Sequence, residues 1–394
     1  MAVIDGYSPQ WRVVPAATMA LVFLVGISLP WIGLLREQPA VLAFENRGLT
    51  AFPEKPRDFQ QTLTWPKQFE AWFSDRTWGR EQAFSISRSL LLQFAGRAPT
   101  ERILIGKNGF MFFKGEEADA FDKWFLGRPA YTADNLTTFR NEFERRRRWF
   151  TEQGMRYYLV VVPEKFSIYP EMVPSRFGGD HHVKRLEQIE RVMEGVDGFL
   201  SLRPELLKSK SSELLYYRTD SHWNGRGALL GYHAIIKMLR RDFPSLEARS
   251  SLIPPPGDDF YIQDLANMIG NPDLGTPERL EMRDFYHLAK LKPAHARQVE
   301  LAPTQSGYAA NWAAERWLND APQVPVKVLV LRDSTSNPLR PSLADHFAES
   351  VFLTTHRYDK ATITSERPAV VLEIIVERGA GGLIDGYFSL QEAP

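Results

Sequence analysis

Apolar and polar positions form repeated blocks along this chain, and the blocks predict an α/β fold. Short continuous apolar runs are typical of strands buried on both faces of a sheet. They lie at 157–163, 198–202, 214–217, 326–331, 351–353 and 369–376. Stretches expected to be helical lie before and between them, at 133–153, 183–196, 228–241 and 341–348. Strands that alternate with helices predict a mainly parallel sheet covered by helices on both faces.

The N-terminal pattern is different and predicts a membrane anchor. Residues 13–35 contain no charged side chain and are numerous enough to cross a bilayer as one helix. A cleaved signal peptide is the main alternative, although its apolar core would be shorter and no small-residue cleavage site stands out. A buried soluble helix is a third possibility. We therefore expect an anchor at 1–36, followed by a soluble portion outside the membrane.

The soluble portion divides into two predicted parts. Residues 37–100 are expected to be a helical lead-in, and 101–394 a catalytic domain. A hairpin is predicted at 102–113, because Asn108-Gly109 is a strong tight-turn signal between two apolar runs. Residues 243–325 are rich in Pro and Gly turns. We interpret them as a long insertion between sheet strands, and such insertions often shape a binding site.

Composition and charge exclude several classes of function. The chain has 394 residues and no cysteine, which excludes disulfides, cysteine nucleophiles and cysteine-bound metals. Lys plus Arg and Asp plus Glu both number 48, so the formal net charge is zero. Zero net charge argues against nucleic acid as a partner. The one strongly basic run, Arg145–Arg148, is expected to be a solvated helix face rather than an anion or membrane-surface site.

The first candidate for chemistry is the segment Thr219-Asp220-Ser221-His222-Trp223-Asn224. A histidine can move a proton near neutral pH, and a neighbouring aspartate can fix its tautomer. Asp220 and His222 could also do no more than hydrogen-bond the backbone of a turn. Acting as a base, His222 would need a nucleophile from elsewhere in the chain.

Ser334 is the candidate nucleophile. It follows the apolar run 326–331 directly, where the predicted strand turns toward a helix. Sites in parallel sheets lie at the carboxyl ends of strands, and neighbouring backbone N–H groups there can stabilise an oxyanion. Ser336 is the second choice, and the bland alternative is that Ser334 only caps a turn. Together, the hydroxyl, imidazole and carboxylate are the three groups that acyl transfer requires.

A metal site is an alternative interpretation of the same residues. Asp220 and His222 could bind a metal with a third ligand such as Asp333 or His356. No HxxxH pattern or cysteine cluster supports this, so we expect neither a metal nor a cofactor. His181, His182 and His346 have no chemical groups beside them in the sequence and are expected at the surface or in packing.

Several segments resemble the AlgX/AlgJ family of alginate O-acetyltransferases, which have an SGNH-hydrolase-like domain. The segment 219–224, TDSHWN, resembles the family signature T-D-x-H-W-N. Four more segments agree in order and spacing: IGKNGFMFF at 105–113, VVPEKFSIYPEMVP at 161–174, DLANMIG at 264–270 and PAVVLEIIVER at 368–378. The resemblance covers roughly 100–378. The family would have Gly where Arg332 stands beside the serine turn, which affects the expected oxyanion geometry.

The resemblance implies a covalent mechanism and a set of partners. Ser334 would take an acetyl group and pass it to a sugar hydroxyl, with His222 as base and then acid and Asp220 orienting it. The acceptor would be an exported polysaccharide. The donor would be supplied by a multispanning membrane acyltransferase, and the catalytic domain would lie in the periplasm, tethered to the inner membrane. An acetyl esterase using the same triad, or an inactive glycan-binding scaffold of a secretion complex, are the alternatives.

Overall fold

The computed structural model describes thirteen stretches of the chain, and all statements below concern these. They are residues 16–35, 41–42, 47–80, 83, 86–87, 100–115, 120–177, 183–248, 263–269, 294–299, 314–356, 358–385 and 390–391. His181 and His182 fall outside the described residues, as does most of the predicted insertion at 243–325. The chain forms two compact units: Met1–Ala95 with Met268–Asn271, and Gly96–Asn267 with Pro272–Pro394.

The described residues of the first unit include the helices α1 and α2 and a short strand pair. Helix α1 spans Ala16–Ile32 and α2 spans Phe59–Arg76, while β1 (Val41–Leu42) and β2 (Arg47–Gly48) pair antiparallel. The helical lead-in expected at 37–100 is thus helical over α2 but includes this strand pair. None of the helices in the described stretches has both the length and the apolarity to cross a bilayer. The anchor at 1–36 stays a prediction.

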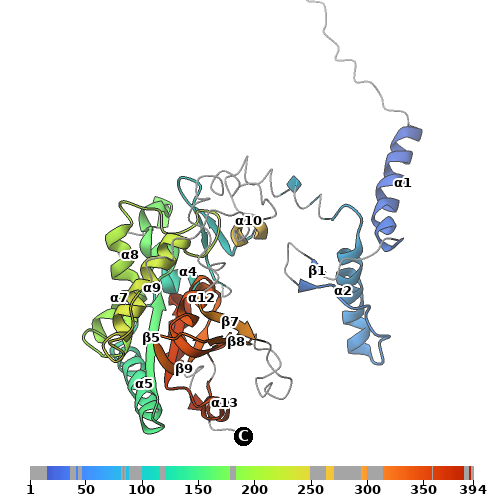
Figure 1. Ribbon diagram of the computed structural model, residues 1–394. Coiled ribbons are helices and arrows are strands. Elements are labelled where there is room, and N and C mark those ends of the chain that lie inside the picture. The colour runs from blue at the N-terminus through green and yellow to red at the C-terminus, as the bar shows by residue number, and fades with distance from the viewer. Residues whose placement is uncertain are drawn as a thin grey trace, which may run out of the picture. The chain divides into compact units, whose positions relative to one another are not determined.

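The second unit is built on a mainly parallel seven-stranded sheet, which confirms the predicted fold class (Figure 1). Its order is β6 (Phe199–Ser201), β5 (Arg156–Val162), β12 (Val370–Val376), β9 (Val324–Arg332), β10 (Phe347–Leu353), β8 (Ala314–Asn319) and β7 (Ala296–Val299). The first five strands are parallel, and β8 and β7 continue the sheet antiparallel. β7 and β8 correct one expectation, because parts of the interval 243–325 are strands of the sheet itself.

Helices cover both faces of this sheet, because alternate residues of each central strand are apolar. Val328 and Val330 of β9 pack on one face with α9 (Gly225–Leu239), α8 (Arg203–Ser209) and α12 (Arg340–Ala344). Leu329 and Leu331 pack on the other with α5 (Ala133–Glu152) and α7 (Arg185–Val192). The remaining elements are α4 (Ala120–Trp124), α6 (Lys165–Ile168), α10 (Asp264–Met268), α13 (Lys360–Glu366), the hairpin β3 (Ile103–Ile105)–β4 (Met111–Phe113), and the pair β11 (Tyr358–Asp359)–β13 (Leu390–Gln391).

Two local expectations were wrong. Residues 214–217 are not a strand: Tyr216 makes a single bridge with Trp223, and the run is buried in the core without joining the sheet. The helix expected at 341–348 ends at Ala344, and Phe347 already begins β10. In both places burial produced the apolar pattern, but the backbone bonded differently: 214–217 bonds locally to 222–224, and Phe347 pairs with β9.

The basic run Arg145–Arg148 on α5 is not a uniformly solvated face. Arg145 and Arg148 are exposed, but Arg146 is fully buried. Its guanidinium donates to Glu142 at 2.9 Å and to the buried Glu373 of β12 at 3.2 Å. A buried arginine needs such partners, because an unpaired charge in the interior is very costly.

Candidate active site

The loop between α8 and α9 carries Asp220 and His222 and is fixed at both ends. The bridge between Tyr216 and Trp223 closes it into a tight turn. Asn224 then caps α9, since its side-chain oxygen accepts from two backbone N–H groups of the first turn at 2.9 and 3.1 Å. Asparagine is among the best helix N-caps. The TDSHWN segment thereby ends a compact loop and begins a helix.

Ser334 lies immediately after β9, where the chain leaves the sheet. The 3-10 helix η8 (Ser334–Leu339) begins here, and Asp333 caps it by accepting from the N–H of Thr335 at 2.9 Å. The second carboxylate oxygen of Asp333 accepts from the N–H of Val376, at the end of the neighbouring strand β12, at 2.7 Å. Ser334 is exposed, although Thr335 and Ser336 directly after it are buried. Its hydroxyl is therefore held at the carboxyl edge of the sheet.

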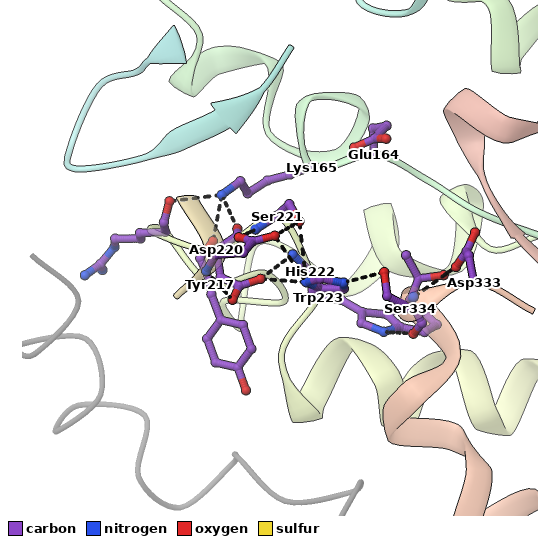
Figure 2. A network of polar contacts seen from close by, with 12 residues as sticks. Glu164, Lys165, Tyr217, Asp220, Ser221, His222, Trp223, Asp333 and Ser334 are labelled. Carbon is purple, nitrogen blue, oxygen red and sulfur yellow. Dashed lines mark hydrogen bonds and ion pairs between the residues drawn. The ribbon is translucent and has the colours of Figure 1, made fainter. Parts of the chain in front are cut away.

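The structure brings Ser334, His222 and Asp220 into one hydrogen-bonded line (Figure 2). His222 Nε2 lies 2.9 Å from Ser334 Oγ, and His222 Nδ1 lies 2.7 Å from Asp220 Oδ1. The same Asp220 oxygen accepts from the backbone N–H of His222 at 2.9 Å. These distances are within the range for a nucleophile, its base and the group that orients the base.

The electrostatics of the line favour an ionised carboxylate beside a basic imidazole. Burial alone would raise the pKa of Asp220, but the charge and hydrogen bonds of His222 outweigh it and lower that pKa to about 2. Burial alone would lower the pKa of His222, but the charge and hydrogen bond of Asp220, with the charge of Asp264, raise it to about 9. The carboxylate thus stabilises the imidazolium that forms when a hydroxyl gives up its proton.

Asp264, at the start of α10, is a fourth member that the sequence did not reveal. Its Oδ2 lies 3.6 Å from His222 Nδ1, and its backbone N–H donates to Asp220 Oδ2 at 3.1 Å. Its carboxylate accepts from the N–H of Ser221 at 2.7 Å and from the Ser221 hydroxyl. Burial and the charge of Asp220 raise the pKa of Asp264 to about 6. The DLANMIG resemblance at 264–270 was the only signal pointing to it.

Ser336, the second choice of nucleophile, is placed differently. Its side chain is 1% exposed, and its hydroxyl donates to the carbonyl of Asp333 at 3.0 Å. It stabilises the η8 turn and does not face His222, which contacts Ser334.

The metal interpretation also changes. The residues that the structure places near Asp220 and His222 include Asp264, and ligand atoms of the three lie within 4.8 Å of one another. Asp333 and His356, the third ligands that the sequence suggested, pair with each other instead. Both nitrogens of His222 already have hydrogen-bond partners within the line to Ser334. This arrangement suits proton transfer better than metal ligation.

Arg332 lies at the end of β9, at the position where the resemblance predicts Gly, and its guanidinium hydrogen-bonds within the serine turn. It donates to Asn337 Oδ1 at 2.7 Å and to the carbonyl of Asp333 at 3.3 Å, and Glu315 of β8 lies 3.9 Å away. Burial and the nearby Arg340 lower the pKa of Arg332 to about 10. Its contacts lie with the turn and with β8, and Ser334 keeps its hydrogen bond to His222.

A second acid–imidazole cluster lies beneath the serine turn. His356 Nδ1 is 3.1 Å from Glu373 Oε1, and His356 Nε2 is 3.6 Å from Asp333 Oδ2. Burial alone would lower the pKa of His356, but its bonds to these carboxylates raise it to about 9. Tyr157 donates to Glu373 at 2.6 Å, and Arg146 donates to the same carboxylate.

His346, by contrast, is a packing residue, hydrogen-bonded to Tyr232 and Gln323.

Comparisons with known proteins show which family the chain belongs to. No curated protein matches the chain. Among solved structures, it is similar to PatB1 of Bacillus cereus (14% identity, 72% of this chain and 98% of that one, TM-score 0.46). It is also similar to a DHHW family protein of Eubacterium siraeum (15% identity, 74% of this chain and 99% of that one, TM-score 0.46). A further similar structure is the O-acetyltransferase domain of Pseudomonas putida AlgJ (17% identity, 71% of this chain and 92% of that one, TM-score 0.39).

The family model that matches is the SGNH hydrolase-like domain of the acetyltransferase AlgX, over residues 103–307. The match covers more than half of the chain and contains Asp220, His222 and Asp264. The chain belongs to the AlgX family of SGNH hydrolase-like acetyltransferases.

Proposed function

We propose that this protein is an O-acetyltransferase that acetylates an exported polysaccharide through an acetyl-Ser334 intermediate. The observation that carries the proposal is the contact of an exposed serine hydroxyl with an imidazole that is held by a buried carboxylate. Membership of an acetyltransferase family indicates that the transferred group is acetyl, and the geometry indicates which residues would transfer it. Because all three groups of a triad are hydrogen-bonded and the serine is exposed, we favour an enzyme over an inactive scaffold.

The proposed reaction has two symmetrical halves. In the first, His222 Nε2 accepts the Ser334 proton as Oγ attacks the acetyl carbonyl, and the imidazolium then protonates the leaving group of the donor. In the second, a sugar hydroxyl gives its proton to His222 and attacks the acetyl-serine, and Ser334 regains a proton as the acetylated sugar leaves. Asp220 stays ionised throughout and stabilises each imidazolium.

The proposed setting is the outer side of the cytoplasmic membrane. Residues 13–35 would anchor the chain, and the second unit would lie in the periplasm. The acetyl group would come from a multispanning membrane acyltransferase, because acetyl-CoA is absent there. An acetyl esterase is the second candidate, since water can replace the sugar hydroxyl in the second half.

The test uses the detergent-solubilised full chain with a chromogenic acetyl ester, in the presence and absence of acceptor oligosaccharides. We expect acetyl release by the wild type, a loss of about 10³-fold or more in Ser334→Ala, and near-normal rates in the matched control Ser336→Ala. Acetylated oligosaccharide detected by mass spectrometry supports the transferase, and release into water alone supports the esterase. Full activity of Ser334→Ala would contradict both.

A further inference from the structure

Lys165 is a buried cation beside the loop that carries Asp220. It is the first residue of α6, at the carboxyl end of β5, and its side chain is 2% exposed. The proposed reaction assigns it no role. A buried ammonium is expensive unless hydrogen bonds satisfy its charge, so its partners indicate what it does.

Lys165 donates hydrogen bonds to three carbonyls of a single loop. Its Nζ donates to the carbonyls of Tyr217, Arg218 and Asp220, at 2.8, 2.9 and 2.7 Å (Figure 2). A lysine ammonium has three N–H donors, and these three contacts match that number. Three carbonyl dipoles that converge on one point repel one another unless a cation lies between them. The ammonium of Lys165 therefore offsets the repulsion among these three carbonyls.

Lys165 is itself held by rigid parts of the fold. The N–H of Glu164 donates to Glu377 Oε2 at 2.8 Å, and the hydroxyl of Ser167 donates to Glu377 Oε1 at 2.9 Å. Glu377 directly follows β12, so these contacts fasten α6 to the sheet. The rings of Phe110 and Phe112 lie 5.9 and 5.5 Å from the ammonium. The cation thus connects a fixed support to a loop that has no strand of its own.

We propose that Lys165 is a positioning residue of the acyl-transfer site: its ammonium holds the Tyr217–Asp220 loop in the shape that sets Asp220 against His222. The kinetic test of this proposal rests on the proposed function, whereas the contacts between Lys165 and the loop do not depend on it. Asp220 is linked to Lys165 through its own carbonyl, so a shift of the loop moves its carboxylate and the imidazole together. We expect the catalytic rate to depend on both the charge and the length of the side chain at position 165. A neutral side chain of the same size should not maintain the rate.

The absence of cysteine from this chain makes a clean test possible. Lys165→Cys introduces a single thiol, which is alkylated in urea before refolding. Bromoethylamine rebuilds a lysine-length side chain with an ammonium, and bromopropane builds a neutral group of the same length. Wild type, with no thiol, passes through the same steps as the control. The two products differ by charge in nearly equal volume.

We expect the propyl form to lose about 100-fold in kcat on the chromogenic ester with little change in KM, as for a misplaced catalytic group. The aminoethyl form should recover to within about tenfold of wild type, because its ammonium can reach the same carbonyls. Equal activity of the two forms would overturn the proposal and leave only a packing role. A refolded aminoethyl form with a wild-type urea midpoint but no recovered activity would overturn it as well.

A second measurement separates this inference from the proposed function. The rate at which a small sulfonyl fluoride labels Ser334 reports the reactivity of the hydroxyl whether or not the protein transfers acetyl groups. Slow labelling of the propyl form and fast labelling of the aminoethyl form would support Lys165 even if acetyl transfer fails. If the neutral forms do not refold, Lys165→Arg keeps the charge with a different donor geometry. We then expect a reduced labelling rate, and a wild-type rate would overturn the proposal.

Discussion

The indole N–H of Trp223 donates to the carbonyl of Thr335 at 2.8 Å. Each of these residues directly follows a member of the proposed triad, so this bond ties the His222 loop to the Ser334 turn at a second point. Trp223 is 2% exposed, and its ring lies against Gly231 of α9, where an added Cβ would come within 2.7 Å of the ring. The distance between base and nucleophile is thus set partly by packing beside them.

Replacing Trp223 with phenylalanine should weaken the site more than the fold. Trp223→Phe keeps an aromatic ring but removes the N–H, leaving the buried Thr335 carbonyl without that donor, at a cost of about 1–3 kcal/mol in the free energy of unfolding. We expect kcat for acetyl release to fall about tenfold or more, because His222 and Ser334 are no longer held together. Trp149→Phe on α5 is the matched control and should leave kcat unchanged. Steady-state kinetics and urea unfolding measure both effects, and normal kcat in Trp223→Phe would contradict the role.

The activity should depend on pH through His222 and Asp264. The pKa of His222 is raised to about 9, so the imidazole is mostly protonated at neutral pH and cannot accept the serine proton. We therefore expect kcat/KM of the wild type to rise with pH toward about 9. Asp264→Asn removes a negative charge 3.6 Å from Nδ1. The pKa of His222 should fall, and the rising limb should move to lower pH.

The pH–rate profile and NMR titration of His222 measure that shift independently of each other. Ser221→Ala is the control, because it removes the hydroxyl that contacts Asp264 and keeps the carboxylate. An unchanged His222 titration in Asp264→Asn would show that its carboxylate has no electrostatic influence on the base.

The buried arginine of the basic run, Arg146, should matter for stability, and the exposed Arg148 should not. Arg146→Met leaves Glu373 buried without one of its cationic partners, which should cost about 3 kcal/mol in the free energy of unfolding. Arg148→Met, two residues further along α5 and exposed, should change the free energy of unfolding by less than about 0.5 kcal/mol. Urea denaturation of the two variants decides the matter, and equal midpoints would mean that the Glu373 cluster needs no arginine.

Arg332 should act through the serine turn. Arg332→Met removes the hydrogen bonds to Asn337 and to the Asp333 carbonyl, so we expect a loss of about 1–3 kcal/mol in stability. The kcat should stay within about tenfold of wild type, since Asp333 still caps the turn at Thr335. Thermal unfolding with kinetics on the same preparations tests this. Complete loss of acetyl release with unchanged stability would instead give Arg332 a direct part in the chemistry.

The hydrophobic pattern was enough to predict the five parallel strands and the helices α5, α7 and α9, because central strands such as β5 and β12 are apolar on both faces. It failed at 214–217 because burial alone does not distinguish a strand from a packed loop. Residue types predicted that Asp220, His222 and Ser334 belong together. Asp264 and Lys165 could not be predicted in the same way, since they act through backbone groups and through the tertiary placement of α10 and α6. Such contacts leave no periodic signal in the sequence.

The place of β12 in the sheet has a consequence for biogenesis. This late strand pairs with both β5 and β9, and its residue Val376 donates to the Asp333 carboxylate next to Ser334. If the chain is exported from its N-terminus, as proposed, Asp220 and His222 emerge first and Ser334 follows. The strand β12, which lies between β5 and β9, emerges after them. The contact of Val376 with Asp333 cannot form until β12 is available, and pairing between such distant segments is slow. We therefore expect the proposed triad to reach its final geometry only after β12 has joined the sheet.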